Sequence, residues 1–327
     1  MIKAIMNIPI TQSKEWQKLQ DDLGEKSIFV SNDKYQYLGI IKKTPVGKYL
    51  YCPYGPVAKD KKAFELAIDS ITNYAKKEKL IFARIEPYDE KMSEGLPKTA
   101  QKSKDLNPKE TWILDLKGSE EELKLKLPER LLRYHRAADK KGITITKSHD
   151  PEDIKHLVDL QAKLASAKKI NVFSLDYLKT EAAQPFATTY IVNYKDPETD
   201  KTETIAAGLV FDDKDTRYNL QGAQSDTGRK LHATGILTIQ LILDAKEKGL
   251  ERFDFWGIAP DDAPDDHPWK GFTNFKKTFA GTEVRHAGTY DLVINPIKYK
   301  TYQITRKINL IKRKIWKSSI SIKEQNV

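Results

Sequence analysis

Short strand-like runs alternate with helical patterns along the whole chain, and this alternation most constrains the fold. Apolar residues at helical spacing predict long helices over residues 60–78 and 231–249. Runs rich in β-branched and aromatic residues predict strands between the helices. The predicted strands cover residues 34–41, 48–52, 80–85, 111–116, 143–147, 188–193, 204–211, 217–222, 252–256 and 290–294. We therefore predict an α+β fold, and the length of 327 residues suggests two domains.

The positive charge of the chain is concentrated at its C-terminal end. The formal net charge is +10, with 56 Lys and Arg against 46 Asp and Glu. Residues 298–327 contain nine bases and one acid, so they carry +8 of this charge. Six isoleucines fall on one stripe at about 100° per residue. They are Ile297, Ile304, Ile308, Ile311, Ile315 and Ile322. This pattern predicts a basic amphipathic helix.

Two interpretations of this helix are open, and they are compatible. In the first, the isoleucine stripe docks on the body of the protein. In the second, the helix contacts an anionic membrane surface or RNA directly. The other 297 residues are nearly neutral, so the net charge does not indicate a protein that binds nucleic acid over its whole surface.

Composition excludes several classes of protein. A single cysteine, Cys52, allows neither an internal disulfide nor a Cys-rich zinc site, which favours a reducing compartment. No apolar run reaches the roughly 18 residues of a membrane span. The N-terminal segment lacks the apolar core and cleavage site of a secretory signal. These features predict a cytoplasmic protein, with peripheral contact at the inner face of the membrane through residues 298–327.

Motifs for metal and nucleotide chemistry are missing from the sequence. The six histidines show no metal-binding spacing, and no phosphate-binding Walker loop is present. Residues 259–268 are rich in aspartate and proline and lack the EF-hand pattern, so we predict a solvated loop. The sequence therefore predicts no metal site.

Four segments, taken together and in order, resemble one known family. The first is residues 51–57 (YCPYGPV), and the second is residues 83–87 (ARIEP). The third is residues 218–226 (YNLQGAQSD), followed after a long helix by residues 253–258 (FDFWGI). The fourth, residues 271–281 (GFTNFKKTFAG), is the most specific. Over nearly its whole length the chain resembles the Fem family of aminoacyl-tRNA-dependent peptidyltransferases, which build the interpeptide bridge of bacterial peptidoglycan.

The resemblance implies two tandem domains of the GNAT acyltransferase type. We expect domain 1, on the precursor-binding side, over residues 1–142. Domain 2, with the catalytic lysine and the tRNA acceptor end, is expected over residues 143–297, and the basic helix of residues 298–327 is expected to dock back on domain 1. Some family members carry a coiled-coil arm in domain 2. Here about 35 residues separate two predicted elements at that place, without a heptad pattern, so the chain resembles the compact members without an arm.

The resemblance also implies a reaction. A side-chain amine of the stem peptide in a peptidoglycan precursor attacks the ester carbonyl of an aminoacyl-tRNA. The ester is already reactive, so the protein has to align the substrates and stabilise the oxyanion. The resemblance gives the stabilising role to Lys276, with Phe275 packing beside it and shaping the site. From the residues alone, Lys276 is one of the chain's 56 bases on an exposed helix face.

The resemblance places precursor contacts on further residues. Glu86 matches a functional carboxylate of the family, with Arg84 in the same segment, although a structural Arg84–Glu86 pair is equally open. Tyr177 matches a tyrosine that contacts the precursor's diphosphate. Gln221 stands where relatives without the arm have a tyrosine in the site.

One departure from the family pattern lies four residues before Tyr177. The family has an arginine there, whereas this chain has Phe173. Arg130, which shares a predicted helix with Arg133 and Arg136, is a candidate to supply the missing cation. A solvated face is the ordinary interpretation of such a helix.

We therefore expect an aminoacyltransferase that acts as a monomer, needs no cofactor and uses aminoacyl-tRNA as the donor. Its acceptor is UDP-MurNAc-pentapeptide or lipid II. One alternative is a tandem-GNAT N-acyltransferase that uses an acyl-CoA or another acyl donor on a different amine. Residues 228–235 disfavour it, because they place His232 and Thr234 where a pyrophosphate-binding turn needs glycines. A non-catalytic module that docks on membranes or RNA is a further alternative.

Overall fold

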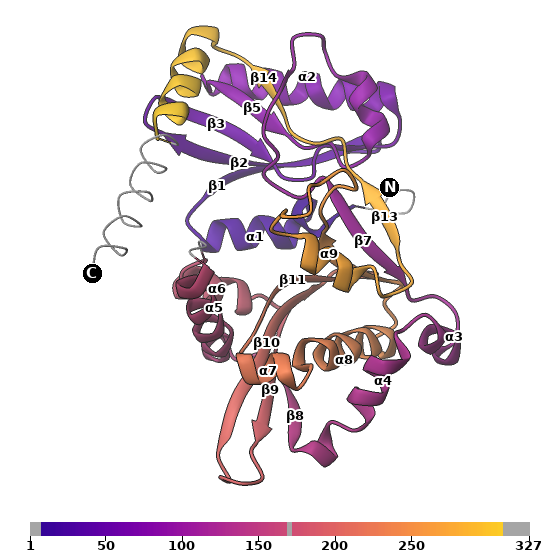
Figure 1. Cartoon of the computed structure of the whole chain (residues 1–327). Helices are drawn as coiled ribbons and strands as arrows, with labels where there is room; N and C mark the ends of the chain where they lie inside the picture. The colour runs from indigo at the N-terminus through magenta and orange to yellow at the C-terminus, as the bar shows by residue number, and fades with distance from the viewer. Residues whose placement is uncertain (1–7, 169–171, 310–327) are drawn as a thin grey trace, which may run out of the picture. The chain divides into compact units, whose positions relative to one another are not determined.

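The chain folds into two α+β units, each built on its own mixed sheet (Figure 1). The computed structural model describes residues 8–168 and 172–309. Unit 1 comprises Met1–Asn107 and His286–Val327, and unit 2 comprises Pro108–Arg285. Unit 1 is therefore discontinuous in sequence, because the chain returns to it after completing unit 2.

The sheet of unit 1 combines strands from both ends of the chain. Its strands are β1 Lys26–Ser31, β2 Tyr35–Thr44, β3 Gly47–Cys52, β4 Val57–Ala58, β5 Phe82–Ile85, β6 Gln101–Lys102 and β14 Tyr290–Val293. They are ordered β1-β2-β3-β5-β14-β6, and β4 pairs with β2. Strands β3 and β5 are parallel, and the other neighbours are antiparallel. Strand β14 thus lies between β5 and β6, although it follows them by many residues in the sequence.

Two α-helices accompany this sheet. Helix α1 Lys14–Asp22 precedes β1, and helix α2 Lys61–Lys77 connects β4 to β5. Helix α2 begins where the Asp60 side chain accepts a hydrogen bond from Ala63 N at 2.7 Å. Its buried side shares one core with Leu50 and Leu292 from the sheet. The buried residues of α2 are Ala63, Phe64, Ala67, Ile68, Ile71 and Ala75. The apolar pattern over residues 60–78 predicts this helix correctly.

The sheet of unit 2 has seven strands. They are β7 Glu110–Asp115, β8 Ile143–Ser148, β9 Ala187–Lys195, β10 Thr202–Asp212, β11 Thr216–Gln224, β12 Arg252–Gly257 and β13 Thr282–Arg285. Their order is β13-β7-β12-β11-β10-β9-β8. Strands β11 and β12 are parallel, whereas the other neighbouring pairs are antiparallel. The parallel pair requires a crossover connection, which helices supply.

The helices of unit 2 are α3 Glu120–Leu125, α4 Glu129–Arg136, α5 Lys155–Lys168, α6 Leu175–Ala182, α7 Asp226–Lys230, α8 Ala233–Glu247 and α9 Lys270–Lys276. Helices α7 and α8 form the crossover between β11 and β12. Helix α8 is apolar around most of its circumference and packs in the core of unit 2 with Leu131 of α4 and Val210 of β10. Only residues 169–174 separate α5 from α6, which leaves no room there for an inserted arm.

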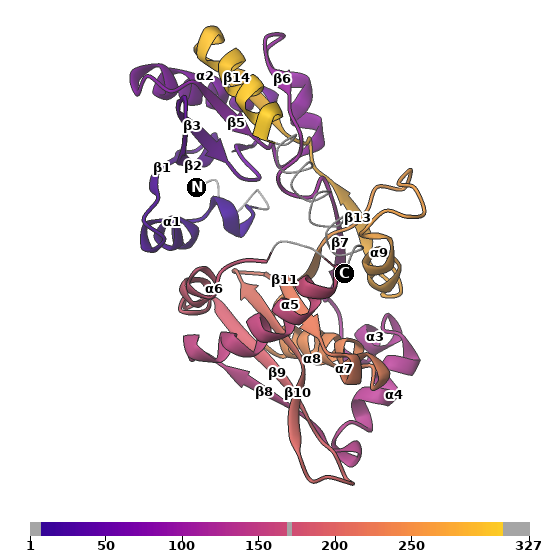
Figure 2. The same cartoon turned by 60° about the vertical axis from the view of Figure 1, so that its left-hand side comes forward.

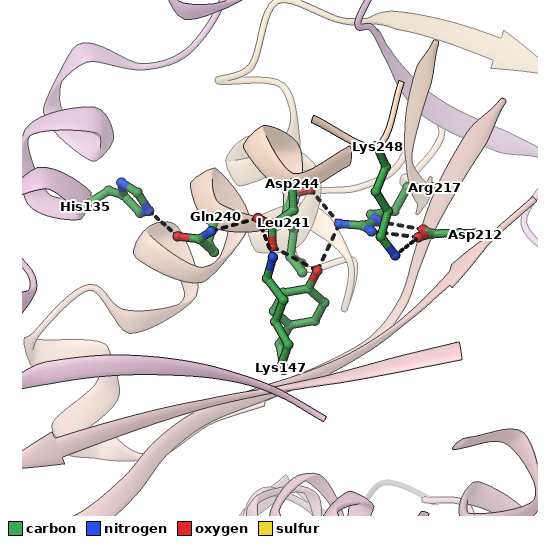
Figure 3. Close-up of polar contacts among 9 residues, drawn as sticks. His135, Lys147, Asp212, Arg217, Gln240, Leu241, Asp244 and Lys248 are labelled. Atoms are coloured by element: carbon green, nitrogen blue, oxygen red, sulfur yellow. Dashed lines mark hydrogen bonds and ion pairs between the residues drawn. The ribbon is translucent and has the colours of Figure 1, made fainter. Parts of the chain in front are cut away.

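A buried polar network fixes α8 to the sheet (Figure 3). The Arg217 guanidinium donates to both carboxylate oxygens of Asp212, at 2.6 and 2.7 Å, and to the Leu241 carbonyl of α8 at 2.9 Å. The Tyr190 hydroxyl donates to Asp244 of α8 at 2.9 Å. Further members of the network are His135, Lys147, Gln240 and Lys248. Each charge in this network has an opposite charge or a hydrogen-bond partner, which is the condition for burying it.

The boundaries of the units differ from those expected at residues 142 and 297. Residues 108–142 belong to unit 2, because β7 pairs with β12 and β13, and α4 packs on α8. Residues 286–297 belong to unit 1, because β14 pairs with β5 and β6. Strand pairing between distant segments sets both boundaries, and periodicity along the sequence does not report such pairing.

Residues 296–309 form a helix that packs on unit 1. Tyr299 and Tyr302 make the contact with the Phe82 ring, at 5.2 and 4.9 Å between ring centroids. The interpretation in which the isoleucine stripe docks is wrong for the described residues, because Ile297, Ile304 and Ile308 are exposed. The other three isoleucines of the stripe lie outside the described residues. Within residues 8–168 and 172–309, every helix is too short or too polar to cross a membrane.

A buried ion pair joins β5 to β14. The Arg84 side chain donates from Nε to Asp291 Oδ1 at 2.7 Å and from Nη2 to Asp291 Oδ2 at 2.8 Å. Both side chains are almost fully buried. The Tyr299 hydroxyl donates to the same carboxylate at 2.8 Å, so the pair also holds the helix of residues 296–309.

We expect Asp291→Ala to lower the free energy of unfolding of unit 1 by about 3–5 kcal/mol, because it leaves the Arg84 charge buried without a partner. The measurement is native-state hydrogen exchange of peptides from β5 and β14 in the full chain. Lys18→Ala serves as the control, because it breaks an exposed ion pair with Asp22 and should cost less than about 1 kcal/mol. Equal exchange rates in the two variants would contradict this role of the pair.

Candidate active site

Lys276 ends helix α9, and its side chain reaches back to the end of β12. Its Nζ donates a hydrogen bond to the Gly257 carbonyl at 2.6 Å. The side chain is half-buried, and burial lowers the pKa of the ammonium to about 8. An ammonium has three N–H donors, and Gly257 is its hydrogen-bond acceptor among the described residues. Two donors therefore remain for an oxygen of a substrate.

Asp254 lies on β12 and is 4% exposed. Its carboxylate accepts a hydrogen bond from Trp256 N at 2.7 Å, and burial raises its pKa to about 7. The negative charge of Asp254 partly opposes the effect of burial on the pKa of Lys276. Trp256 has a φ of +65°, a left-handed conformation that is uncommon for a residue with a side chain. Asp254 thus both supports the strained turn before Gly257 and favours the charged form of Lys276.

Asp254 is not among the site residues predicted from the sequence. The available signal was one acid in the apolar run of residues 252–256, whose neighbours Phe253 and Phe255 are fully buried. A lone carboxylate at a buried strand position needs a partner, and such groups often have perturbed pKa values at functional sites. This signal does not identify the partner, because Lys276 lies in another element.

The rest of the fourth sequence segment holds α9 in place. Phe279 is fully buried, and its carbonyl accepts a hydrogen bond from Trp112 Nε1 at 3.1 Å. A Cβ at Gly281 would lie 2.6 Å from Trp112 Nε1, so only glycine allows this close approach. Phe275 is half-buried and packs against the core of unit 2 at 5.5 Å from the Phe279 ring. The segment therefore fixes the helix from which Lys276 projects.

Glu86 follows β5 in unit 1 and is 3% exposed. Its carboxylate accepts hydrogen bonds from the Tyr51 hydroxyl at 2.9 Å, from Asn107 Nδ2 at 2.7 Å and from Thr289 Oγ1 at 3.0 Å. Three backbone N–H groups also donate to it, those of Tyr54, Leu106 and Asn107. These donors come from three separate segments of unit 1. The carboxylate therefore joins the ends of distant segments, whatever else it does.

Arg84 pairs with Asp291. The alternative from the sequence, a structural pair of Arg84 with Glu86, is therefore wrong. Its guanidinium is 2% exposed and lies over the rings of Tyr49 and Phe82. These contacts favour a structural role for Arg84. Glu86 and Arg84 belong to unit 1, whereas Phe275 and Lys276 belong to unit 2.

Tyr177 lies in the first turn of α6, where Ser174 caps the helix. Burial raises the pKa of its phenol, and the neighbouring Glu181 raises it further. Glu181 is itself buried, which raises its pKa to about 7. The exposed Phe173 ring stacks on Tyr177 at 4.8 Å. An ionised Glu181 beside the hydroxyl disfavours an anionic ligand, so a diphosphate contact of Tyr177 stays a prediction.

Two more predicted contacts lie in unit 2. The Gln221 side chain of β11 accepts a hydrogen bond from Gln161 Nε2 of α5 at 3.0 Å. Arg130 is exposed on α4, as are Arg133 and Arg136 on the same helix. Nothing in the described contacts ties these arginines to Tyr177, so their role in place of the missing arginine also stays a prediction.

The turn between α7 and α8 differs from a phosphate-binding turn. His232 precedes α8 with φ of +59°, and its ring stacks on Tyr134 of α4 at 4.6 Å. A phosphate-binding turn presents backbone N–H groups to the ligand, and glycine lets the ligand approach them. Here an imidazole packed on a tyrosine occupies that position. The local structure disfavours a cradled pyrophosphate.

One open pocket lies apart from these residues, whereas the acidic loop of residues 259–268 contacts α9. The pocket has a volume of about 380 Å³ and lies between the β2–β3 turn and the helix of residues 296–309. None of the predicted site residues lines it. Asp261 of the acidic loop accepts a hydrogen bond from Lys277 at 2.9 Å. Within the described part of the chain, no group of three His, Cys, Asp or Glu side chains is placed to hold a metal ion.

Solved structures share this fold. FemX aligns with a TM-score of 0.77 at 18% identity, over 92% of this chain and 96% of that chain. L-PGS from Bacillus licheniformis aligns with a TM-score of 0.56 at 15% identity, over 93% and 99%. A conserved protein of unknown function from Bacteroides thetaiotaomicron aligns with a TM-score of 0.53 at 12% identity, over 87% and 90%. The predicted α+β fold class, with two units, is confirmed.

A protein-family model also matches part of the sequence. Residues 180–307 match the model of the FemAB family. That range contains Gln221, Asp254 and Lys276. The sequence matches none of the curated proteins. Together with the fold shared with FemX, the match confirms the resemblance to the Fem family.

We expect Glu86→Gln to lower the free energy of unfolding of unit 1 by about 1–3 kcal/mol, because an amide accepts fewer of the converging hydrogen bonds than a carboxylate. Hydrogen exchange of peptides from β5 and residues 103–109 measures this change. Glu65→Gln, the same substitution at an exposed position of α2, should change it by less than about 0.5 kcal/mol. Unaltered exchange in Glu86→Gln would show that the carboxylate is not structural.

Proposed function

We propose that the protein is a non-ribosomal aminoacyltransferase. It transfers an amino acid from aminoacyl-tRNA to the stem-peptide amine of a peptidoglycan precursor, either UDP-MurNAc-pentapeptide or lipid II. The FemAB match over residues 180–307 and the fold shared with FemX support a bridge-forming enzyme in general. The observation that carries the proposal is Lys276, a half-buried ammonium whose hydrogen bond to Gly257 leaves two donors for a substrate oxygen.

The reaction is aminolysis of an ester. The amine nitrogen of the stem peptide forms a bond to the ester carbonyl carbon, and the carbonyl oxygen becomes an oxyanion. The bond between that carbon and the ribose oxygen of tRNA then breaks, the nitrogen loses a proton, and the ribose hydroxyl is restored. The protein holds the two reactants together and meets the charge that develops on the oxyanion.

Lys276 is suited to meet that charge. Its backbone comes from a helix held by Phe279 and Gly281, and its Nζ is fixed by the Gly257 carbonyl. A preorganised cation in a partly buried site needs little reorganisation when the oxyanion forms, and it acts there more strongly than in water. Phe275 packs beside this position and limits water.

Contacts with the precursor are assigned by the resemblance. Glu86 would act from the unit 1 side, with the hydroxyl of Tyr51 and the amide of Asn107 as its immediate neighbours. Tyr177, Gln221 and Arg130 complete the predicted set. The alternative acyl-CoA donor is disfavoured by the His232 turn before α8.

The test is single-turnover transfer from a panel of charged tRNAs to each precursor. We expect Lys276→Met to lower the rate of transfer by about 10²–10³-fold, the usual effect of removing an oxyanion donor. Precursor affinity, measured by calorimetry, should stay unchanged, because the lysine acts on the oxyanion that forms during reaction. Absence of transfer by the wild-type protein to either precursor would overturn the proposal.

Lys277→Met is the matched control for this experiment. Lys277 is the next residue along the chain, is exposed, and pairs with Asp261. Its substitution changes the net charge equally but leaves the Gly257 contact in place. Equal rates for the two variants would remove Lys276 from the mechanism.

We also expect the rate to fall as pH rises through about 8, because Lys276 loses its charge there. Asp254 has a pKa of about 7 and is ionised at that pH, so its charge raises the pKa of Lys276. Asp254→Asn removes this charge, lowers the pKa of Lys276 and moves the alkaline fall in rate to lower pH. Transfer rates measured from pH 6 to 10 report this shift, which amounts to about one pH unit for 1.4 kcal/mol of lost interaction.

Asp261→Asn is the control for the pH profile, because Asp261 is an exposed acid that pairs with Lys277. Its alkaline limb should coincide with that of the wild-type protein. Arg252 on β12 is the other charged group coupled to Asp254, and it is unchanged in both variants. An identical limb in Asp254→Asn and wild type would contradict the coupling.

A further inference from the structure

The helix of residues 296–309 has two different apolar faces. One face carries Tyr299 and Tyr302, which pack with Phe82 and Tyr49 of unit 1. Figures 1 and 2 show this helix, in yellow, against the sheet that contains β5 and β14. The aromatic face is therefore packed against unit 1, and this packing fixes the rotation of the helix about its axis.

The opposite face carries isoleucines that make no such contact. Ile297 is 81% exposed, Ile304 is 50% exposed and Ile308 is 47% exposed. At 3.6 residues per turn these three positions fall within roughly 40° of one another, on the side away from the two tyrosines. Three large apolar side chains in one row on a solvent-facing helix mark a contact surface, because isolated exposed residues do not form such a row.

Lysines flank the isoleucine row on both sides. Lys300 and Lys307 lie along one side of it and Lys298 along the other, and all three are exposed. No acid occurs among residues 296–309. This apolar row with a basic border is the pattern of a helix that lies in the interface of an anionic bilayer. The sequence of residues 310–327 adds five bases and one acid to the same end of the chain.

We propose that the exposed face of this helix docks on an anionic lipid surface. The side chains of Ile297, Ile304 and Ile308 enter the boundary between headgroups and acyl chains, while the flanking lysines contact lipid phosphates. A second copy of the chain fits less well, because a symmetric contact would bring the lysines of both copies together. RNA also fits less well, because a phosphate backbone offers no apolar surface for the isoleucines.

This surface goes beyond the proposed transfer reaction and does not depend on it. The tyrosine face fixes the helix on unit 1, so the lipid surface would hold unit 1 itself. Lipid binding is measured without substrates, so its outcome is separate from that of the transfer assay.

The test is co-sedimentation of the full chain with vesicles of phosphatidylcholine, with and without phosphatidylglycerol as roughly one third of the lipid. We expect binding to the anionic vesicles that weakens as salt is raised, and little binding to the neutral ones. The triple variant Ile297→Gln, Ile304→Gln and Ile308→Gln should bind the anionic vesicles at least about tenfold more weakly, because its helix no longer buries apolar area in the interface.

A matched triple variant substitutes glutamine for three exposed leucines elsewhere, Leu66, Leu106 and Leu125. It should bind vesicles like the wild-type protein. Circular dichroism of both variants should match wild type, because all six side chains are exposed. Equal vesicle binding by the isoleucine variant and the wild type, or no binding by the wild type, would overturn the proposal. So would a dimer in sedimentation velocity that the isoleucine substitutions dissociate.

Discussion

The Arg84–Asp291 ion pair is the contact on which the connectivity of this protein depends. The two residues are 207 positions apart in sequence, and their bidentate contact places β14 beside β5. All of unit 2 is inserted between these strands, so the chain can close unit 1 only by bringing residues 286–293 back to it. A buried pair of opposite charges is sensitive to register, because a slip by one residue would leave both charges unpaired.

The Asp291 carboxylate also contacts the helix that follows the sheet. The Tyr299 hydroxyl donates to Asp291, and the Tyr299 ring packs on Phe82, so the helix of residues 296–309 takes its orientation from this pair. The exposed isoleucine row is a consequence of that orientation. Glu86, the residue that follows β5, accepts hydrogen bonds from three segments of unit 1. Strand β5 and the residue after it therefore organise unit 1 around two buried charges.

Unit 2 holds the ammonium of Lys276 partly out of water. Burial lowers the pKa of Lys276, and Asp254 opposes that effect from β12. The balance keeps the lysine charged near neutral pH while its ammonium stays poorly solvated, and such a cation interacts strongly with an incoming negative charge. The strained turn at Trp256 places the Gly257 carbonyl within reach of Nζ. Strain of this kind persists where the surrounding structure enforces it, and here Asp254 holds the turn.

Sequence patterns predicted the elements of this fold better than their partners. The apolar periodicity of α2 and α8 and the strand runs over residues 204–211 and 252–256 are local signals, and the structure contains those elements. The unit boundary after residue 107 could not be predicted, because the pairing of β7 with β12 produces no pattern in the local sequence. The exposure of the isoleucine row could not be predicted, because periodicity shows that a face is apolar and does not show whether that face is buried.

In the candidate site, too, the sequence indicated individual residues better than the contacts between residues far apart in the chain. The fourth segment led to Lys276 and Phe275 through the family resemblance, and the structure adds the Gly257 carbonyl and Asp254 as neighbours. The alternative in which Arg84 pairs with Glu86 was wrong, because both Asp291 and Glu86 are acids and only the strand order places Asp291 beside Arg84. Whether Tyr177, Gln221 and Arg130 contact the precursor depends on a bound substrate and stays a prediction.

Aminoacyl transfer to the precursor is tested most directly by mass spectrometry of the acceptor after reaction with a mixed pool of charged tRNAs. The two precursors are incubated separately with the wild-type protein, and a parallel reaction replaces the tRNA pool with acetyl-CoA. We expect one precursor to gain the mass of a single amino-acid residue with the tRNA pool and to gain nothing with acetyl-CoA. An acetyl mass shift, or an unchanged mass with every donor, would contradict this expectation.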